Sequence, residues 1–106
     1  MDQVLVVVHM LFAKGETEAA IDALTPAAEL SQQEPGCIKF AVHRDVDDPD
    51  VLLIIEEWES REAYEGHLKQ PHLQQLNETM VPLFAGVPRI SVSRGLGIGD
   101  ESKGVI

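Results

Sequence analysis

The stretch VLLIIEEWESREAYEGHL, residues 51–68, holds a strand, a tight turn and a helix in direct succession. Residues 51–58 are aliphatic or aromatic except for two adjacent glutamates, which is typical of a buried strand. Ser60 is a good N-cap, and the pattern after it indicates a helix over about 60–70 whose inward face carries Ala63, Tyr64, His67 and Leu68. Only Glu59 and Ser60 separate the two elements, so we expect the helix to fold back along its own strand.

Further strand patterns lie on both sides of this unit. They cover residues 4–12, 37–43 and 89–94, which are rich in β-branched and apolar residues. The segment 44–50 is a short polar loop, so the strands before and after it are predicted to form an antiparallel hairpin.

Helix patterns fill the remaining sequence. One helix is predicted over 16–32, with a kink or a break at Pro26, and a short one is predicted to begin at Pro71. The order strand, helix, strand, strand, helix, strand predicts an α+β fold, a ferredoxin-like βαββαβ unit with an antiparallel sheet. We assign the domain to residues 1–94 and expect the tail 95–106 to be flexible or to contact a partner.

The central strands are apolar on both faces. For residues 51–58 the two apolar sets are Val51, Leu53 and Ile55 on one face and Leu52, Ile54 and Trp58 on the other. The strand segment 4–8 is also apolar on both faces, whereas one layer of helices covers only one. A second copy of the same sheet is the simplest cover for the other face, so the sequence predicts a homodimer through the sheet face.

Composition and charge narrow the range of partners and locations. The chain has 106 residues and a net charge of −10, with 8 basic residues that do not cluster. Neither nucleic acid nor an anionic membrane is therefore expected as a partner. The apolar run Val4 to Val8 is too short for a signal-peptide core or a membrane span, and a single cysteine forms no internal disulfide. These features favour a cytoplasmic location.

Two side chains form the most informative pair in the sequence. Glu56 lies on the strand and His67 on the inward face of the following helix, at similar distances from the turn between them. A carboxylate beside an imidazole can fix the tautomer of the ring, which can then take a proton from a substrate. From spacing alone, a purely structural pairing of the two remains an alternative. Residues expected around this pair are Trp58, Tyr64, Phe40 and Ile38, the last two on one face of the partner strand.

The other candidate residues carry weaker signals. Cys37 begins a strand after a tight turn and is interpreted as a small buried residue, not a nucleophile. His72 either lines the pocket mouth or caps the short helix, and His9 and His43 are expected at the surface. The histidines lack the spacing of a structural zinc site, and no dinucleotide or phosphate-binding loop is present. We therefore predict neither a metal nor an organic cofactor.

Several motifs resemble the antibiotic biosynthesis monooxygenase family. They keep the order and spacing of that family across residues 4–94, and they are Glu34-Pro35-Gly36-Cys37, Phe40-x-Val42-x-Arg44-Asp45, Glu56-x-Trp58, His67 and Pro71-His72. The runs Ile55-Glu56-Glu57-Trp58-Glu59-Ser60 and His67-Leu68-x-x-Pro71-His72 look especially like those of bacterial quinol monooxygenases.

The resemblance implies a dimeric α+β barrel and an enzyme that oxidises a quinol or polyphenol with O2, without metal, flavin or haem. The partners would be a small aromatic substrate, O2 and a second copy of the chain. His67 would be the base and Glu56 the residue that orients it. The substrate-binding residues would be Trp58, Tyr64, Phe40, Ile38 and His72.

Three other functions remain open at this stage. An isomerase of a phosphorylated signal molecule would need a cluster of cations, which Lys39, Arg44, Lys69 and Arg89 would have to supply against the acidic background. A binding or stress protein would hold a hydrophobic ligand without turnover. A haem-degrading protein would need an axial ligand such as His67.

Overall fold

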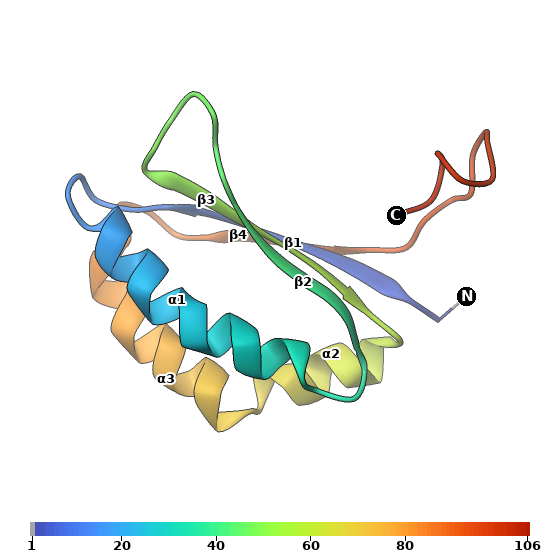
Figure 1. Ribbon diagram of the computed structural model, residues 1–106, viewed down its shortest axis with the longest axis horizontal. Helices are drawn as coiled ribbons and strands as arrows, with labels where there is room; N and C mark the ends of the chain where they lie inside the picture. The colour runs from blue at the N-terminus through green and yellow to red at the C-terminus, as the bar shows by residue number, and fades with distance from the viewer. Residues whose placement is uncertain (1) are drawn as a thin grey trace.

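The computed structural model describes residues 2–106, and its strands and helices follow the predicted order (Figure 1). The elements are β1 (Val4–Leu11), α1 (Thr17–Gln32), β2 (Cys37–Arg44), β3 (Val51–Trp58), α2 (Arg61–Leu68), α3 (Pro71–Met80), a 3-10 turn η1 (Val81–Leu83) and β4 (Arg89–Ser93). The bounds of β3 coincide with those predicted, and the ends of the other elements differ by a few residues at most.

The sheet is antiparallel throughout, with the strand order β2-β3-β1-β4. This order confirms the α+β, ferredoxin-like prediction. Glu56 on β3 lies opposite Val6 of β1 on one side and Phe40 of β2 on the other, so this carboxyl group is at the centre of the sheet. Residues paired across an antiparallel sheet share a face, which places all three on the side that the helices cover.

The helices lie together on one face of the sheet (Figure 1). α1 and α3 run side by side, and α2 follows the turn after β3. The Ser60 hydroxyl accepts a hydrogen bond from the backbone N–H of Ala63, which confirms Ser60 as the N-cap of α2. Pro71 is in the first turn of α3, as predicted, where its missing N–H costs no helical hydrogen bond.

Of the two outcomes expected at Pro26, a kink or a break, the break is wrong, because α1 continues from Thr17 to Gln32 as one helix. Pro26 is exposed, so water can satisfy the backbone carbonyl that the proline ring leaves without its helical partner. The opposite face of the helix packs on the sheet, and this packing stabilises α1 as one helix. The buried side chains on this face are small or aliphatic: Ala20, Leu24, Ala27 and Ala28.

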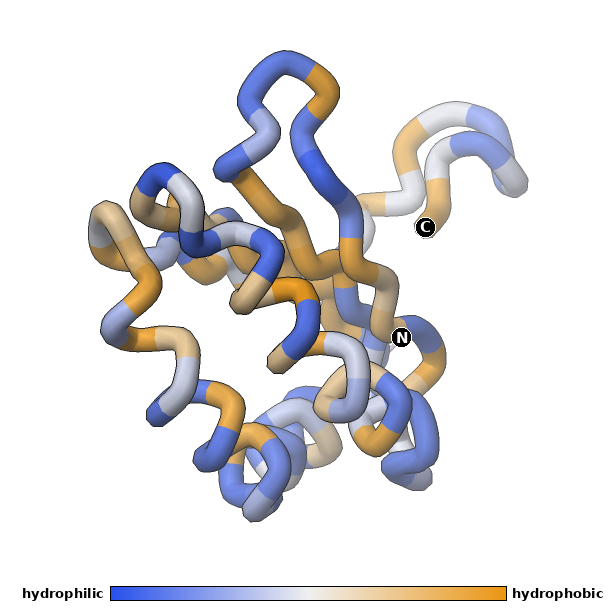
Figure 2. The backbone as a smooth tube through the Cα atoms, turned by 60° about the vertical axis from the view of Figure 1, so that its left-hand side comes forward, coloured by the Kyte–Doolittle hydropathy of each residue, from blue (hydrophilic) through white to orange (hydrophobic). Residues whose placement is uncertain are grey.

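The hairpin between β2 and β3 extends beyond the helices, and its tip is mostly hydrophilic (Figure 2). The carboxylate of Asp45 accepts hydrogen bonds from the backbone N–H groups of Asp47 and Asp48 at 2.9 and 2.8 Å, which closes the turn. Among residues 2–106, no helix has both the length and the apolar composition that crossing a lipid bilayer requires.

The second face of the sheet has no helix over it within the described chain (Figure 1). Val7, Leu53 and Ile55 point to this face, since their neighbours Val6, Ile54 and Glu56 are buried beneath the helices. All three remain partly exposed. We therefore propose, as the sequence predicts, that a second copy of the sheet covers them.

The Val7→Lys variant tests this dimer. Lysine at the centre of the open face puts a charge where the partner sheet would lie, so we expect monomers at micromolar concentration in sedimentation velocity. The wild-type chain should sediment at twice its mass of 11.6 kDa. Val46→Lys is the matched control, because Val46 is 96% exposed at the hairpin tip and should leave the dimer intact. A wild-type monomer under these conditions contradicts the proposal.

Candidate functional site

His67 is the most deeply buried titratable side chain of the candidate site, with 2% exposure. It points from α2 toward the sheet and is surrounded by aromatic rings. Its ring centroid lies 4.6 Å from that of Trp58, 5.7 Å from Phe40 and 6.4 Å from Tyr64. These contacts fix the plane of the imidazole, so its two nitrogens face different surroundings.

The Nδ1 nitrogen of His67 lies 2.7 Å from Oε2 of Glu34, a residue in the turn between α1 and β2. The Nε2 nitrogen of His72, on α3, lies 3.0 Å from the same oxygen. An ionised carboxylate has no proton to give, so both imidazoles donate to it, and His67 carries its proton on Nδ1. Glu34 is therefore the carboxylate that fixes the tautomer, a role that the sequence assigned to Glu56.

A glycine brings Glu34 to this position. A Cβ atom on Gly36 would collide with the Cβ of Ala63 on α2, so only glycine allows the turn and the helix to approach this closely. The carbonyl of Gly36 also accepts a hydrogen bond from the N–H of Glu59 at 2.9 Å. The turn before β2 and the turn after β3 are thereby tied together, with Glu34 next to α2.

The Nε2 nitrogen of His67 faces the sheet. Oε1 of Glu56 lies 3.9 Å from it, which is too long for a hydrogen bond. That oxygen instead accepts a hydrogen bond of 2.8 Å from the indole N–H of Trp58. Glu56 is therefore a neighbour of the imidazole, held in place by Trp58, with room left beside Nε2.

This room belongs to a cavity of about 110 Å³ between the sheet and the helices α2 and α3. Glu56, Tyr64, His67 and Asn77 are the only polar side chains among its lining residues. The others are apolar: Val8, Phe40, Ile54, Leu68, Leu73, Leu76 and Ile90. A base and a carboxyl group thus face a small, mostly apolar space.

Burial is the largest influence on the pKa values of the titratable groups around this cavity. It raises the pKa of Glu56 to about 7, although the hydrogen bond from Trp58 acts in the other direction. It also lowers the pKa of His67 below its ordinary value, against the opposing influence of Glu34. The pKa of the Tyr64 phenol is raised, first by burial and then by Glu56. At neutral pH the imidazole is therefore neutral, and Nε2 has a free lone pair.

The structure separates the predicted site residues into three groups. His67, Glu56, Tyr64 and Phe40 meet around the cavity, as the sequence predicts. Trp58 and His72, which the sequence predicts as substrate-binding residues, contact the histidine but do not line this cavity. Trp58 packs against the imidazole ring in a tilted arrangement, and His72 shares Glu34 with it.

Ile38 is not part of the site. The pairing of β2 with β3 is irregular between Cys37 and Lys39, so Ile38 is an extra residue at a bulge and is 40% exposed. A strand without this bulge would put Ile38 on the same face as Phe40, which was the expectation. Cys37 is half-buried, and burial raises the pKa of its thiol to about 11, in keeping with a residue that is not a nucleophile.

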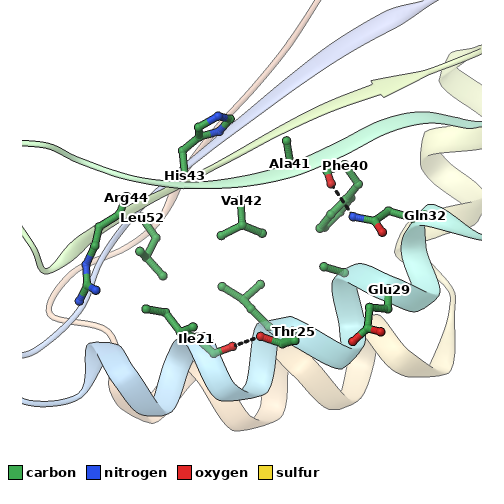
Figure 3. A pocket seen from close by; sticks show the side chains of 12 residues that line it. Ile21, Thr25, Glu29, Gln32, Phe40, Ala41, Val42, His43, Arg44 and Leu52 are labelled. Carbon is green, nitrogen blue, oxygen red and sulfur yellow. Dashed lines mark hydrogen bonds between the residues drawn. The ribbon is translucent and has the colours of Figure 1, made fainter.

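A larger groove of about 700 Å³ lies between α1 and the edge strand β2 (Figure 3). Val42 points toward α1, whereas Ala41 and His43 point away from the groove. The side-chain amide of Gln32 donates a hydrogen bond of 2.9 Å to the carbonyl of Phe40. Neither His67 nor Glu56 reaches this groove, so it lacks the acid–base pair of the smaller cavity.

The raised pKa of Glu56 predicts a pH dependence of stability. Its folded-state pKa of about 7 lies above the ordinary 4.5, so the favourable contribution is complete below pH 4.5 and is lost as the pH rises through 7. Between pH 5 and pH 8 the wild type should lose on the order of 2 kcal/mol of unfolding free energy relative to Glu56→Gln, measured by urea denaturation. Glu59→Gln, at an exposed site in the turn after β3, should follow the wild type. Parallel profiles for wild type and Glu56→Gln would show that Glu56 titrates normally.

Several solved structures share this fold. A Nitrosomonas europaea protein assigned to the antibiotic biosynthesis monooxygenases aligns with a TM-score of 0.87 and 22% identity, over 93% of this chain and 95% of its own. PA3566 from Pseudomonas aeruginosa aligns with a TM-score of 0.84 and 23% identity, over 91% and 96% of the two chains. Rv0793 from Mycobacterium tuberculosis gives 0.84 and 20%, over 89% and 95%. At these identities the likeness establishes the fold.

Sequence comparison establishes the family. No curated protein matches the chain. The model of the family described as "Antibiotic biosynthesis monooxygenase" matches residues 3–79, which include Glu34, Glu56, His67 and His72. This confirms the resemblance seen in the motifs. The chain therefore belongs to the antibiotic biosynthesis monooxygenase family.

Proposed function

We propose that this protein is a cofactor-independent monooxygenase that oxidises a quinol with O2, and that His67 is its base. The observation that carries the proposal is the state of the His67 imidazole. Glu34 holds its Nδ1–H at 2.7 Å, and its unprotonated Nε2 lies beside a mostly apolar cavity. A neutral buried imidazole in this orientation is suited to taking a proton from a phenol.

The two carboxyl groups support the charge that this step creates. Proton transfer from the quinol hydroxyl to Nε2 gives an imidazolium and a phenolate. Glu34 is already bonded to Nδ1, so it stabilises the imidazolium without rearrangement. Glu56, at 3.9 Å from Nε2, adds a second negative charge as it ionises near pH 7.

The phenolate can then react with O2 without a metal or a flavin, because an electron-rich anion can give an electron to triplet oxygen. One oxygen atom enters the ring and the other leaves as water, so a hydroquinone becomes a hydroxyquinone. The substrate supplies all four electrons, and no further reductant is required. The protein contributes a base, an orientation and a space with few polar groups.

The size of the cavity favours a substrate with one ring. The cavity beside His67 measures about 110 Å³, which is smaller than the cavity of about 150 Å³ that accepts benzene in another protein, so one ring is the most that can enter it, and its side chains must shift to admit that ring. Tyr64 and Phe40 provide aromatic walls, and Asn77 and Tyr64 offer polar groups for a ring hydroxyl. A monocyclic quinol with small substituents fits these dimensions better than a polycyclic polyphenol.

The alternatives find less support. No lysine or arginine of residues 2–106 lines the cavity, so a phosphorylated substrate would have no cationic partner there. The same cavity is far too small for a porphyrin. A binding protein without turnover would use the apolar walls but would not need a base held in one tautomer.

Turnover of the His67→Ala variant tests the proposal. Loss of the base should lower the rate of quinol oxidation by about 10²–10⁴-fold, measured as O2 uptake with a panel of monocyclic quinols. Glu34→Gln should lower it by about 10-fold to 100-fold, since the charge beside the imidazolium disappears. Glu56→Gln should have the smallest effect of the three.

Two controls make these rates interpretable. His43→Ala removes an exposed histidine outside the site and should retain the wild-type rate. Thermal unfolding of each variant separates a lost base from a lost fold, because removing a buried side chain leaves a cavity. A folded His67→Ala protein with full activity would refute the role of His67.

A further inference from the structure

The Nδ1 edge of the His67 ring, which is turned away from the cavity, belongs to a second cluster of side chains. Oε2 of Glu34, Nδ1 of His67 and Nε2 of His72 all lie within 4.8 Å of one another. We infer that these three atoms form a binding site for a divalent transition-metal ion such as Zn²⁺, and that the bound ion holds His67 in the tautomer that cannot act as a base. Only the consequence for turnover rests on the proposed function.

The donor set suits zinc. Two imidazole nitrogens and one carboxylate oxygen are ligands that Zn²⁺ prefers, at about 2.0–2.2 Å, with a fourth position left for water. Ligand atoms at those lengths lie about 3.4 Å apart in a tetrahedron. The present spacings of 2.7 Å and 3.0 Å to Oε2 need to open by about 0.7 Å and about 0.4 Å, and the two imidazole nitrogens already lie within 4.8 Å of each other.

The cluster is accessible from a different side than the proposed substrate cavity. The side chains of Glu34 and His72 are 11% and 15% exposed. His72 also lines a cavity of about 190 Å³ between α1 and α3, which contains neither His67 nor Glu56. The net charge of −10 favours the approach of a cation. An ion can therefore reach the cluster without passing through the cavity at Nε2.

Binding would change the chemistry of the other side of the ring. In the metal-free protein Nδ1 carries the proton and Nε2 has the lone pair. A metal ion bound to Nδ1 takes the place of the proton on that nitrogen. The neutral imidazole must then carry its proton on Nε2. Nε2 then becomes a donor toward Glu56 and cannot accept a proton from a substrate. The ion would thus be an inhibitor, not a cofactor.

Zinc titration of the intact protein tests the site without any activity assay. Isothermal titration with ZnCl2 in a buffer that does not bind metal should show one ion per chain. His72→Ala and Glu34→Gln should each weaken binding by at least about 10-fold, because each removes one ligand. His43→Ala is the matched control, since it removes an exposed histidine outside the cluster and should bind as the wild type does.

The tautomer provides the second measurement. In ¹⁵N-labelled protein, saturating Zn²⁺ should move the His67 proton from Nδ1 to Nε2, seen in the long-range ¹H–¹⁵N couplings of the ring. Absence of zinc binding, or equal binding by wild type and His72→Ala, would overturn the site. Zinc binding with the Nδ1–H tautomer retained would overturn the switch. If the tautomer changes but no quinol is oxidised, this inference stands and the proposed monooxygenase function fails.

Discussion

The hydrogen bond between Glu34 and His67 is the interaction on which the chemistry of this site depends. It assigns the proton of a buried imidazole to Nδ1 and leaves Nε2 free beside the cavity. Without a charged partner, an imidazole that is 2% exposed would be neutral and would have no preferred tautomer. Burial would make its protonated form strongly unfavourable. With Glu34 in place, protonation creates an ion pair of good geometry in a site of low dielectric.

Local packing makes that bond possible. The missing side chain of Gly36 allows the turn before β2 to lie against Ala63, and the hydrogen bond from Glu59 to Gly36 ties both turns together. Trp58 packs at a tilt against the imidazole and donates a hydrogen bond to Glu56, so the second carboxyl group is also fixed. The carboxyl groups of Glu34 and Glu56 are thereby held near opposite nitrogens of one ring.

Much of the fold follows from the sequence because its signals are local. A continuous apolar run, interrupted only by two adjacent glutamates, defines β3, and Ser60 and Pro71 mark the starts of two helices. The sequence does not show that α1 continues through Pro26, because the exposure of the carbonyl that this proline leaves unpaired depends on tertiary packing. Periodicity brought Glu56 near His67, but it could not reveal Glu34, which contacts His67 across 33 positions through a close approach at Gly36. The sequence shows Glu34 within the family motif Glu34-Pro35-Gly36-Cys37 but does not point to its contact with His67. The prediction that Ile38 shares a face with Phe40 is wrong because of a bulge. A bulge changes which side chains share a face and leaves no periodic signal in the sequence.

The central claim is that His67 is a neutral imidazole with its proton on Nδ1 and a free lone pair on Nε2. The most direct test is the ¹⁵N spectrum of the His67 ring in metal-free protein at neutral pH. The account predicts a protonated, pyrrole-like shift for Nδ1 and an unprotonated, pyridine-like shift for Nε2. In Glu34→Gln this preference should weaken. A protonated Nε2 in the metal-free wild-type protein would contradict the account.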